Sequence, residues 1–319
     1  VIRNYSLTDL GTQAALTNAG ASTDLVDLAK CGLLEYPDVF THQADALRSA
    51  ISGRNVVVTA GTGSGKTEAF LLPVLSALLD ESRQWSGTSP PGSNWWEGDN
   101  GAFEAQRKDE TGRLPAIRAL IVYPMNALVE DQLVRLRKSL DSAKARAWLD
   151  SNRQGHRFFF GRYTGRSPVS GTRDNKFKVS DLRERLQDTA SRAAIVAGDD
   201  RRYFLPSLDG AEMRSRWDMQ DHPPDILISN YSMLNIMLMR QLERPMLDKT
   251  RKWLEQSTDH VFHVVVDELH MYRGTAGTEV AYLLRRLLHE LGLTPDHDQV
   301  RFLATSASMP GGDEATAFL

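Results

Sequence analysis

A short apolar run, a glycine-rich loop and a lysine–threonine pair follow one another over residues 55–68, and no other feature constrains the fold as strongly. The run Asn55-Val56-Val57-Val58-Thr59 has the composition of a strand, and the segment that begins at Lys66 has a helical pattern. Between them lies the loop Ala60-Gly61-Thr62-Gly63-Ser64-Gly65. Strand, glycine loop and helix in this order are typical of a phosphate-binding loop in an α/β domain.

The chemistry of this loop predicts a nucleoside triphosphate as ligand. Glycines let successive backbone N–H groups converge on an anion, and the helix N-terminus adds its positive dipole. Lys66 is expected to reach the β- and γ-phosphates, and Thr67 offers a hydroxyl to Mg²⁺. Ala60 departs from the pattern GxxxxGK(S/T), which has glycine at that position. The residues expected to bind the nucleotide are Thr62, Gly63, Ser64, Gly65, Lys66, Thr67 and Glu68.

Composition places the chain among ordinary globular proteins: 319 residues, 41% hydrophobic, 25% charged, with a net charge of −3. The single cysteine, Cys31, excludes an internal disulfide and fits a reducing compartment. No apolar run approaches the roughly 20 residues of a membrane span, and the N-terminus does not have the layout of a signal peptide. We therefore expect a cytoplasmic protein with no membrane partner. Because the chain begins with Val1 rather than methionine, we expect it to be part of something longer.

The charges are unevenly distributed along the chain. The segment 135–216 holds 19 of the 38 Lys and Arg residues and 10 of the 41 Asp and Glu residues, so its surplus is 19 − 10 = 9 positive charges. Such a block can follow a phosphate backbone, or it can be a solvated insertion; charge alone leaves both readings open. The aromatic run at 158–160 within it is better interpreted as a buried strand than as a base-stacking platform.

Short apolar runs alternate with longer helical patterns along most of the chain, which predicts a doubly wound parallel sheet covered on both faces. The expected strands are 55–59, 119–123, 158–163, 225–229, 261–266 and 301–304. The expected helices include 42–52, 66–79, 126–140, 181–190, 231–242 and 278–291.

Two insertions and an N-terminal extension complete the predicted organisation. We expect a small helical extension over 1–35 and an α/β domain over 36–319, with insertions at about 82–113 and 167–222. The first insertion is rich in Gly, Pro, Ser and Asn and has little periodicity, which indicates a long loop. Its tryptophans either anchor a partner or pack back onto the domain, and packing back is favoured; they are Trp85, Trp95 and Trp96.

A second chemical site is predicted where the apolar run Val264-Val265-Val266 ends in two adjacent carboxylates. Ligands of open α/β sheets gather at the carboxyl ends of the strands, so Asp267 and Glu268 are expected beside the phosphate loop. Asp267 is expected to hold Mg²⁺ through water, and Glu268 to orient and polarise the water that attacks the γ-phosphate. Adjacent residues at a strand end diverge, which suits two separate roles.

With these residues in view, the run Asp267-Glu268-Leu269-His270 is a DExH box, and together with AGTGSGKT it resembles the first RecA-like domain of superfamily 2 helicases. The resemblance implies ATP and Mg²⁺ as cofactors and adds His270 to the catalytic set of Lys66, Asp267 and Glu268. Phe40-Thr41-His42-Gln43 resembles the Q motif, in which Gln43 would read the adenine edge; the alternative is a glutamine on a solvent-facing helix. Ser306, Ala307 and Ser308 stand where the family has its coupling motif SAT, with serine in place of the final threonine.

Three further segments resemble the MrfA-like and Hrq-like branch of DNA helicases and large bacterial antiphage helicases such as those of the DISARM and Druantia systems. They are YPMNAL with EDQ over 123–132, PPDILISNYSML over 223–234, and DELHMYRGTAGTEVAYLLRRL over 267–287. The resemblance implies that strand ends and helix N-termini offer short polar groups to phosphates, which position a strand without reading its sequence. The expected nucleic-acid contacts are Pro124, Met125, Asn126, Gln132, Thr164, Gly165, Arg166, Ser229, Asn230, Tyr231, Ser232 and Arg273, of which Arg273 is equally a candidate partner of the DELH carboxylates.

The resemblance implies an ATP-dependent DNA helicase or translocase. Two alternatives use the same motifs: an ATP-gated nucleic-acid clamp or scaffold, and an RNA helicase. The expected partners are DNA, a second RecA-like domain of the same longer protein, and other subunits of a defence system. Nothing in this chain resembles that second domain, which in the family supplies arginine fingers. Because a missing arginine finger lowers the rate about 10³- to 10⁵-fold, this chain alone is expected to bind nucleotide and hydrolyse it slowly.

Overall fold

In the part of the chain that the structure describes, six strands form one parallel sheet. The computed structural model describes residues 11–34, 38–61, 63–87, 92–98, 101–272 and 274–307. The strands are β1 (Val56–Thr59), β2 (Ala119–Tyr123), β3 (Phe160–Tyr163), β4 (Ile226–Asn230), β5 (Phe262–Val266) and β6 (Val300–Ser306). They lie in the order β1-β6-β5-β2-β4-β3, and each neighbouring pair is parallel. The predicted doubly wound α/β fold is therefore confirmed.

Helices cover both faces of this sheet. They are α1 (Thr12–Asn18), α2 (Thr23–Lys30), α3 (Thr41–Ile51), α4 (Lys66–Ser82), α5 (Asn126–Leu140), α6 (Ala143–Asn152), α7 (Lys176–Ile195), α8 (Arg216–Asp221), α9 (Tyr231–Met239), α10 (Arg244–Gln256) and α11 (Thr275–Glu290). Short 3₁₀ turns are η1 (Trp95–Glu97), η2 (Asp200–Phe204), η3 (Gln241–Glu243) and η4 (Leu269–Met271). None of these described helices combines the length and the apolar composition that crossing a membrane requires.

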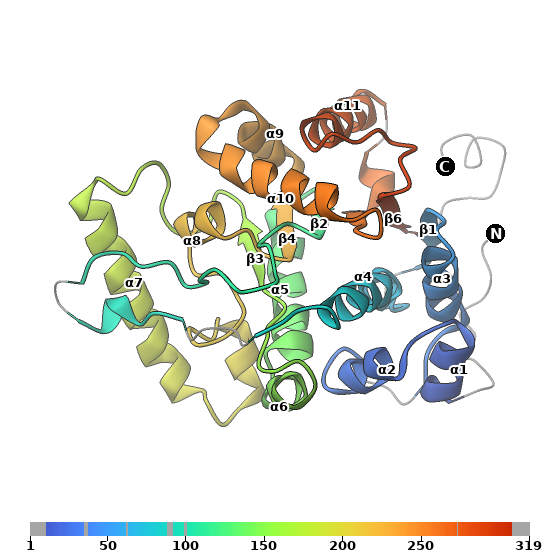
Figure 1. The fold of residues 1–319 in the computed structure, drawn as a ribbon, viewed down its shortest axis with the longest axis horizontal. Coiled ribbons are helices and arrows are strands. Elements are labelled where there is room, and N and C mark those ends of the chain that lie inside the picture. The colour runs from blue at the N-terminus through green and yellow to red at the C-terminus, as the bar shows by residue number, and fades with distance from the viewer. Residues whose placement is uncertain are drawn as a thin grey trace.

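The strand order explains which helix lies on which face. From β1 through β2 to β3 the chain moves across the sheet in one direction, and from β4 through β5 to β6 it returns. Because crossovers between parallel strands are right-handed, a reversal of direction moves the connecting helices to the opposite face. Figure 1 shows this arrangement, with α4 and α5 on one side of the sheet and α9, α10 and α11 on the other.

The central strands form the main hydrophobic core. All five residues of β2 and of β5 are buried, as expected for strands that are covered on both faces. The N-terminal helices belong to the same core, because Leu16, Leu25 and Leu28 are buried in it together with the apolar residues of α4. Several predicted bounds shift: the helix expected over 181–190 extends over Lys176–Ile195, and the strand expected over 301–304 extends over Val300–Ser306. The strand expected from residue 158 begins at 160, and the helix expected to reach 242 ends at 239, because the next residue has extended backbone angles.

The tryptophan-bearing insertion packs back onto the molecule, as favoured from the sequence. Trp95 and Trp96 are buried in a second, smaller core, which they share with Trp217 and two leucines of α7. Figure 1 shows α7 at the outer end of the molecule beyond β3, beside the loop that carries η1. Trp85 is buried in the main core. The two insertions predicted from the sequence are thus joined to each other by one apolar cluster.

Several arginines of the basic segment 135–216 point inward. Arg137 pairs with Glu212, and both side chains are less than 10% exposed. Arg153 pairs with Asp24 of α2, which lies 129 positions earlier in the chain. The guanidinium group of Arg214 donates to the backbone carbonyls of Leu208 and Ser93, one in each insertion. The surplus of positive charge counted in the sequence therefore overstates the charge that this segment presents to a partner.

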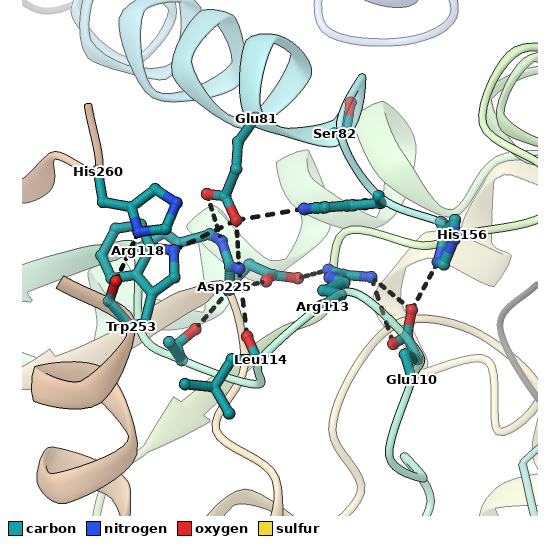
Figure 2. Close-up of polar contacts among 12 residues, drawn as sticks. Glu81, Ser82, Glu110, Arg113, Leu114, Arg118, His156, Asp225, Trp253 and His260 are labelled. Carbon is teal, nitrogen blue, oxygen red and sulfur yellow. Dashed lines mark hydrogen bonds and ion pairs between the residues drawn. The ribbon is translucent and has the colours of Figure 1, made fainter. Parts of the chain in front are cut away.

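Near the amino ends of the strands, a buried network joins acidic and basic side chains (Figure 2). Asp225, which is fully buried, accepts hydrogen bonds from Arg118 at 2.8 Å and from Arg113 at 2.6 Å. Arg118 also pairs with Glu81 at the end of α4. Glu110 pairs with Arg113 at 3.1 Å, and its Oε2 lies 2.6 Å from Nδ1 of the buried His156. We call this group, together with Arg107, the amino-edge network.

Three pKa values in this region reflect burial and neighbouring charge. Burial alone would raise the pKa of Glu110, but hydrogen bonding to His156 and the charges of Arg113 and Arg107 lower it to about 2. At Arg107 burial and the charge of Arg113 prevail instead, and they lower its pKa to about 10. Burial also lowers the pKa of His263 on β5 to about 4. The network therefore stabilises the fold as long as its carboxylates stay ionised.

Candidate nucleotide and nucleic-acid site

The phosphate loop has the backbone shape that anion binding requires. Gly63 and Gly65 have φ angles of 75° and 72°, in the left-handed region that favours glycine. A Cβ on Gly65 would lie 2.2 Å from the side-chain nitrogen of Gln43. Ser64 donates its hydroxyl to the carbonyl of Gly61 at 2.8 Å, which closes the loop just before α4 begins. Three of the predicted site residues lie outside the described residues: Thr62, Arg273 and Ser308.

Ala60 has a packing role that glycine could not perform. It is 4% exposed and lies in a small apolar cluster with Ala46, Val58 and Ala69. It is also absent from the residues with positive φ among those described, so its backbone does not require glycine. The departure from the glycine pattern therefore stabilises the base of the loop, since it adds a methyl group between β1, α3 and α4.

Lys66, the first residue of α4, faces the DELH segment. Its ammonium nitrogen lies 3.6 Å from Glu268 Oε1, and its side chain is only 10% exposed. Within the described residues this buried nitrogen makes no hydrogen bond, although an ammonium group carries three donors. Phosphate oxygens are the acceptors that suit it. The partly buried Thr67 follows on the same helical turn, with a hydroxyl of the kind that binds Mg²⁺ beside nucleotide phosphates.

Asp267 and Glu268 diverge at the end of β5. Asp267 is 8% exposed, and its Oδ1 accepts hydrogen bonds from the Glu268 N–H at 2.8 Å and from the Thr305 hydroxyl of β6. Glu268 has φ 53° and ψ 46°, a left-handed conformation that costs a non-glycine residue about 1–2 kcal/mol. This turn directs Glu268 toward Lys66 while Asp267 is held against β6. Strain of this kind is characteristic of functional positions.

His270 connects the DELH segment with the predicted coupling residues. Its Nδ1 accepts a hydrogen bond from the Ala307 N–H at 3.2 Å and lies 3.4 Å from the Ser306 hydroxyl. The same nitrogen is 3.2 Å from Glu268 Oε2. A nitrogen that accepts from a backbone N–H carries no proton, so it cannot donate to Glu268 at the same time. The structure thus brings the DELH segment together with Ser306 and Ala307 at the carboxyl ends of β5 and β6.

Gln43 is buried rather than solvent-facing, with 4% exposure. Its side-chain oxygen accepts from the Phe40 N–H at 2.8 Å, and its nitrogen donates to the Gly65 carbonyl at 3.0 Å. It therefore ties the start of α3 to the phosphate loop. One N–H and one lone pair of the amide stay available, which is what an adenine edge requires.

A cavity of about 220 Å³ lies beside the phosphate loop. It is lined by Leu33, Leu34, Asp38, Phe40, Gln43, Gly63, Gly65, Glu68 and Arg135. Glu68 and Arg135 form an ion pair on its wall, which links the nucleotide region to α5. The sequence predicted Glu68 only as one of the residues of the phosphate loop. It did not predict the ion pair with Arg135, because Arg135 lies 67 positions from Glu68 in the chain.

The predicted nucleic-acid residues divide into an exposed and a buried set. Asn126 is the first residue of α5 and Asn230 is the N-cap of α9, and Asn230 Nδ2 donates to Asn126 Oδ1 at 2.7 Å. Met125 and Tyr231, beside them, are 52% and 39% exposed. Gly165, Arg166 and Ser232 are exposed and Pro124 is half-buried, at the ends of β3, β4 and β2.

The buried set holds the structure of these strand ends in place. Gln132 is 2% exposed, and its oxygen accepts from the Tyr123 hydroxyl. Ser229 is fully buried and donates to the carbonyl of Tyr163. Thr164 is 1% exposed, and its hydroxyl accepts from the Arg166 N–H, two residues later, at 3.3 Å. Direct phosphate contact by these three side chains stays a prediction, whereas their internal hydrogen bonds are observed.

Two tyrosines beside Asp267 were not anticipated from the sequence. Tyr123 and Tyr272 are 2% and 5% exposed. Burial raises the pKa of each hydroxyl, and the negative charge of Asp267 raises it further. Both phenols therefore stay neutral and can act as donors. The two apolar runs in the sequence predicted where β2 and β5 end. That these two ends are neighbours follows from the strand order, which the local sequence pattern does not determine.

Fold and site together define a RecA-like nucleotide-binding domain of the helicase type. A DEAD/DEAH box helicase family profile matches residues 40–158 and 177–316, and the chain belongs to this family. The Druantia protein DruE of Escherichia coli (strain UMEA 4076-1) is 32% identical over 93% of this chain and 17% of its own length. The ATP-dependent helicase HRQ1 of Saccharomyces cerevisiae is 20% identical over 86% of this chain, which again spans 17% of the relative.

Solved structures show the same fold. The DUF1998 helicase MrfA bound to DNA and AMPPNP superposes with a TM-score of 0.51 at 19% identity, over 99% of this chain and 29% of that one. The DEAD-box helicase Mss116 bound to single-stranded RNA and AMP-PNP gives 0.53 at 14% identity, over 99% of this chain and 43% of that one. The predicted resemblance to superfamily 2 helicases is confirmed, and the chain spans less than half of each of these relatives.

Proposed function

We propose that this chain is the ATP-binding motor domain of a DNA helicase or translocase that acts in the cytoplasm, in bacterial antiphage defence or DNA repair. The observation that carries the proposal is the shared edge of the sheet. Lys66 and Glu268 lie 3.6 Å apart beside Asp267, and the bonded pair Asn126 and Asn230 begins two helices at the same edge. A site for triphosphate and a site for a phosphate backbone are thereby built from neighbouring strand ends. The MrfA structure, which was solved with DNA bound, supports DNA as the nucleic acid.

The residues divide the work of phosphoryl transfer. Backbone N–H groups of the loop and the Lys66 ammonium bind and neutralise the phosphates. Glu268 orients the attacking water and accepts its proton. Mg²⁺, when bound, neutralises charge on the phosphate oxygens, and Thr67 with Asp267 would hold it. The donor set fits this ion, because Mg²⁺ sites combine one or two protein oxygens with phosphates and water.

We further propose that residues 36–319 are the first of two RecA-like domains, with residues 1–35 as a helical extension. The second domain would belong to the same longer protein and would supply arginines to the γ-phosphate. Because such arginines are worth about 10³- to 10⁵-fold in rate, hydrolysis by this chain alone should be slow even where binding is intact. Other defence-system subunits are proposed partners on the strength of the relationship to DruE.

The decisive experiment is steady-state ATP hydrolysis by the full-length natural protein, with single-stranded DNA, duplex DNA, RNA or no nucleic acid, together with a strand-displacement assay. We expect DNA to stimulate hydrolysis, and Lys66→Ala to abolish it. Stimulation without displacement would support a translocase or an ATP-gated clamp. Stimulation by RNA alone would overturn DNA as the substrate, and Lys66→Ala with unchanged hydrolysis would overturn the site.

A further inference from the structure

Tyr123 lies between the nucleotide site and the nucleic-acid edge. It is the last residue of β2, and Asp267 directly follows the neighbouring strand β5. The two strands are in parallel register, with Val122 opposite Val266, and the Asp267 N–H donates to the Val122 carbonyl at 3.2 Å. Tyr123 and Asp267 therefore emerge side by side at the same level of the sheet.

The hydroxyl of Tyr123 reaches from this position to α5. It donates a hydrogen bond to Gln132 Oε1 at 3.0 Å, and both residues are 2% exposed. Gln132 Nε2 is buried and makes no hydrogen bond within the described residues. The Tyr123 hydroxyl is therefore the partner observed for this buried amide, so a shift of either side chain is transmitted to the other. Buried polar groups in a low-dielectric interior are costly to leave unpaired.

Helix α5 connects this contact to the exposed edge. It begins at Asn126, which holds Asn230 at 2.7 Å, and Gln132 follows on the same helix. A ligand that moves the first turn of α5 thus moves Gln132. The line from Asp267 through Tyr123 and Gln132 to Asn126 is contiguous within the described residues.

Building on the proposed function, we propose that Tyr123 is a positioning residue that couples nucleic-acid binding to the nucleotide site through its hydrogen bond to Gln132. It acts on Asp267 by holding the end of β2 against the end of β5 and through its side chain, which interacts with the Asp267 carboxylate as well as with Gln132. Thermodynamic linkage then requires that nucleotide and nucleic acid change each other's affinity by the same factor. Removing the hydroxyl should lower that factor and leave each ligand's separate binding in place.

Tyr272 provides a matched control. It is buried beside the same carboxylate, and its hydroxyl has no hydrogen-bond partner within the described residues. Tyr123→Phe and Tyr272→Phe are therefore the same chemical change beside the same carboxylate, and only the first removes the hydrogen bond to Gln132.

The test compares both variants with the wild type in the full-length natural protein. The readouts are basal ATP hydrolysis, its stimulation by single-stranded DNA, and the affinity for a fluorescent ATP analogue with and without DNA. For Tyr123→Phe we expect a basal rate within about twofold of wild type and a coupling factor reduced about fivefold or more, since allosteric coupling is typically 5–150-fold. Tyr272→Phe should behave like the wild type.

Three outcomes would overturn the inference. Equal coupling in the wild type and Tyr123→Phe would show that the hydrogen bond transmits nothing. Equal losses in both variants would show a general packing effect beside Asp267. A double variant with Gln132→Met whose coupling is lower than that of Tyr123→Phe alone would show that the two residues act separately. A wild type that DNA does not stimulate would instead overturn the proposed function itself, which this inference requires.

Discussion

The two edges of the sheet use the same residue types in opposite ways. At the amino edge, Asp225 and Glu110 are buried with three arginines, and each carboxylate has at least two partners. At the carboxyl edge, Lys66 and Glu268 are 10% and 22% exposed and 3.6 Å apart, too far for a hydrogen bond. Within the described residues, Lys66 Nζ and the neighbouring Glu68 Oε2, Gln132 Nε2 and Tyr272 Oη make no hydrogen bond. At the amino edge the carboxylates are paired, and the unpaired buried atoms there belong to donors or to the histidine ring: Arg107 Nη2, Arg113 Nε and His156 Nε2.

This difference distinguishes charged residues that stabilise the fold from charged residues that are available to interact with a ligand. In a buried network whose carboxylates are all paired with cations, losing one member leaves its partners unpaired in a low dielectric. An unsatisfied, partly open set of charges contributes little to folding but can respond to a ligand. The left-handed Glu268 at the carboxyl edge follows the same logic, since the fold tolerates strain where it positions a functional group.

The largest expected effect is on chemistry at the carboxyl edge. In the full-length protein, Glu268→Gln should lower DNA-stimulated hydrolysis about 10²- to 10⁴-fold, because it removes the proposed general base and keeps the size of the side chain. Nucleotide affinity and the melting temperature should change little. The control is Glu279→Gln, an exposed acid on α11. A variant that hydrolyses normally would remove Glu268 from the catalytic set and erase the contrast between the edges.

The second effect is on stability at the amino edge. Asp225→Ala should lower the free energy of unfolding by about 3–5 kcal/mol, because it leaves Arg113 and Arg118 buried with one carboxylate fewer. Urea unfolding measures this change. The matched control is Asp248→Ala, whose side chain is 53% exposed and which should cost less than about 1 kcal/mol. Equal effects of the two variants would show that the buried network contributes no more than a surface ion pair.

The third prediction concerns pH. His263 has a pKa of about 4 in the folded state against 6.5, and Glu110 about 2 against 4.5, so the unfolded chain binds protons more readily at both groups. The contribution of His263 to the free energy of unfolding is fully present above pH 6.5 and is lost as the pH falls toward 4. The contribution of Glu110 is fully present above pH 4.5 and is lost as the pH falls toward 2. Each is worth about 3 kcal/mol on the scale of 1.36 kcal/mol per pKa unit.

Denaturant unfolding at a series of pH values tests this expectation. His263→Asn should flatten the decline between pH 6.5 and 4 and leave the lower window unchanged. A stability that is constant from pH 7 to 4 in the wild type would contradict the assignment of a neutral, buried His263.

The smallest effect is expected for Arg135, whose ion pair with Glu68 joins α5 to the nucleotide cavity. Its side chain is 48% exposed. Arg135→Ala should therefore change the free energy of unfolding by less than about 1 kcal/mol, as surface ion pairs do. Thermal melting measures it beside Asp225→Ala. A loss as large as that of Asp225→Ala would mean that the carboxyl edge also depends on its charges for folding.

The parts of the structure that were predicted correctly from the sequence are those that local sequence patterns encode. The strand before Gly61 and the strand before Asp267 are short apolar runs, and the phosphate loop has a spacing that few other structures use. These elements and their edge were correctly anticipated. The amino-edge network was not, because Arg113 and Asp225 are 112 positions apart and neither belongs to a motif. Two arginines of the basic segment, Arg137 and Arg153, were counted as charge and turned out to be internal.

Burial was the other property that pattern could not supply. Gln132 lies in a segment similar to a nucleic-acid motif, and its side chain is inside the domain. The sequence shows that a glutamine follows two acids on a helix, but it does not show which way the helix faces when Tyr123 lies beneath it. Strand order decides that, and strand order arises from contacts between distant parts of the chain.

The second apolar core has a consequence for how such a domain can be rebuilt. Trp95 and Trp96 from one insertion and Leu182, Leu186 and Trp217 from the other close a single cluster. Deleting either insertion alone would leave the remaining half with its apolar face in water, a large cost when each aromatic side chain buries about 150–250 Å². The two insertions therefore form one structural unit that comes from two separate parts of the chain. Grafting this unit onto a related domain, or deleting it from this one, requires that both insertions be moved or removed together.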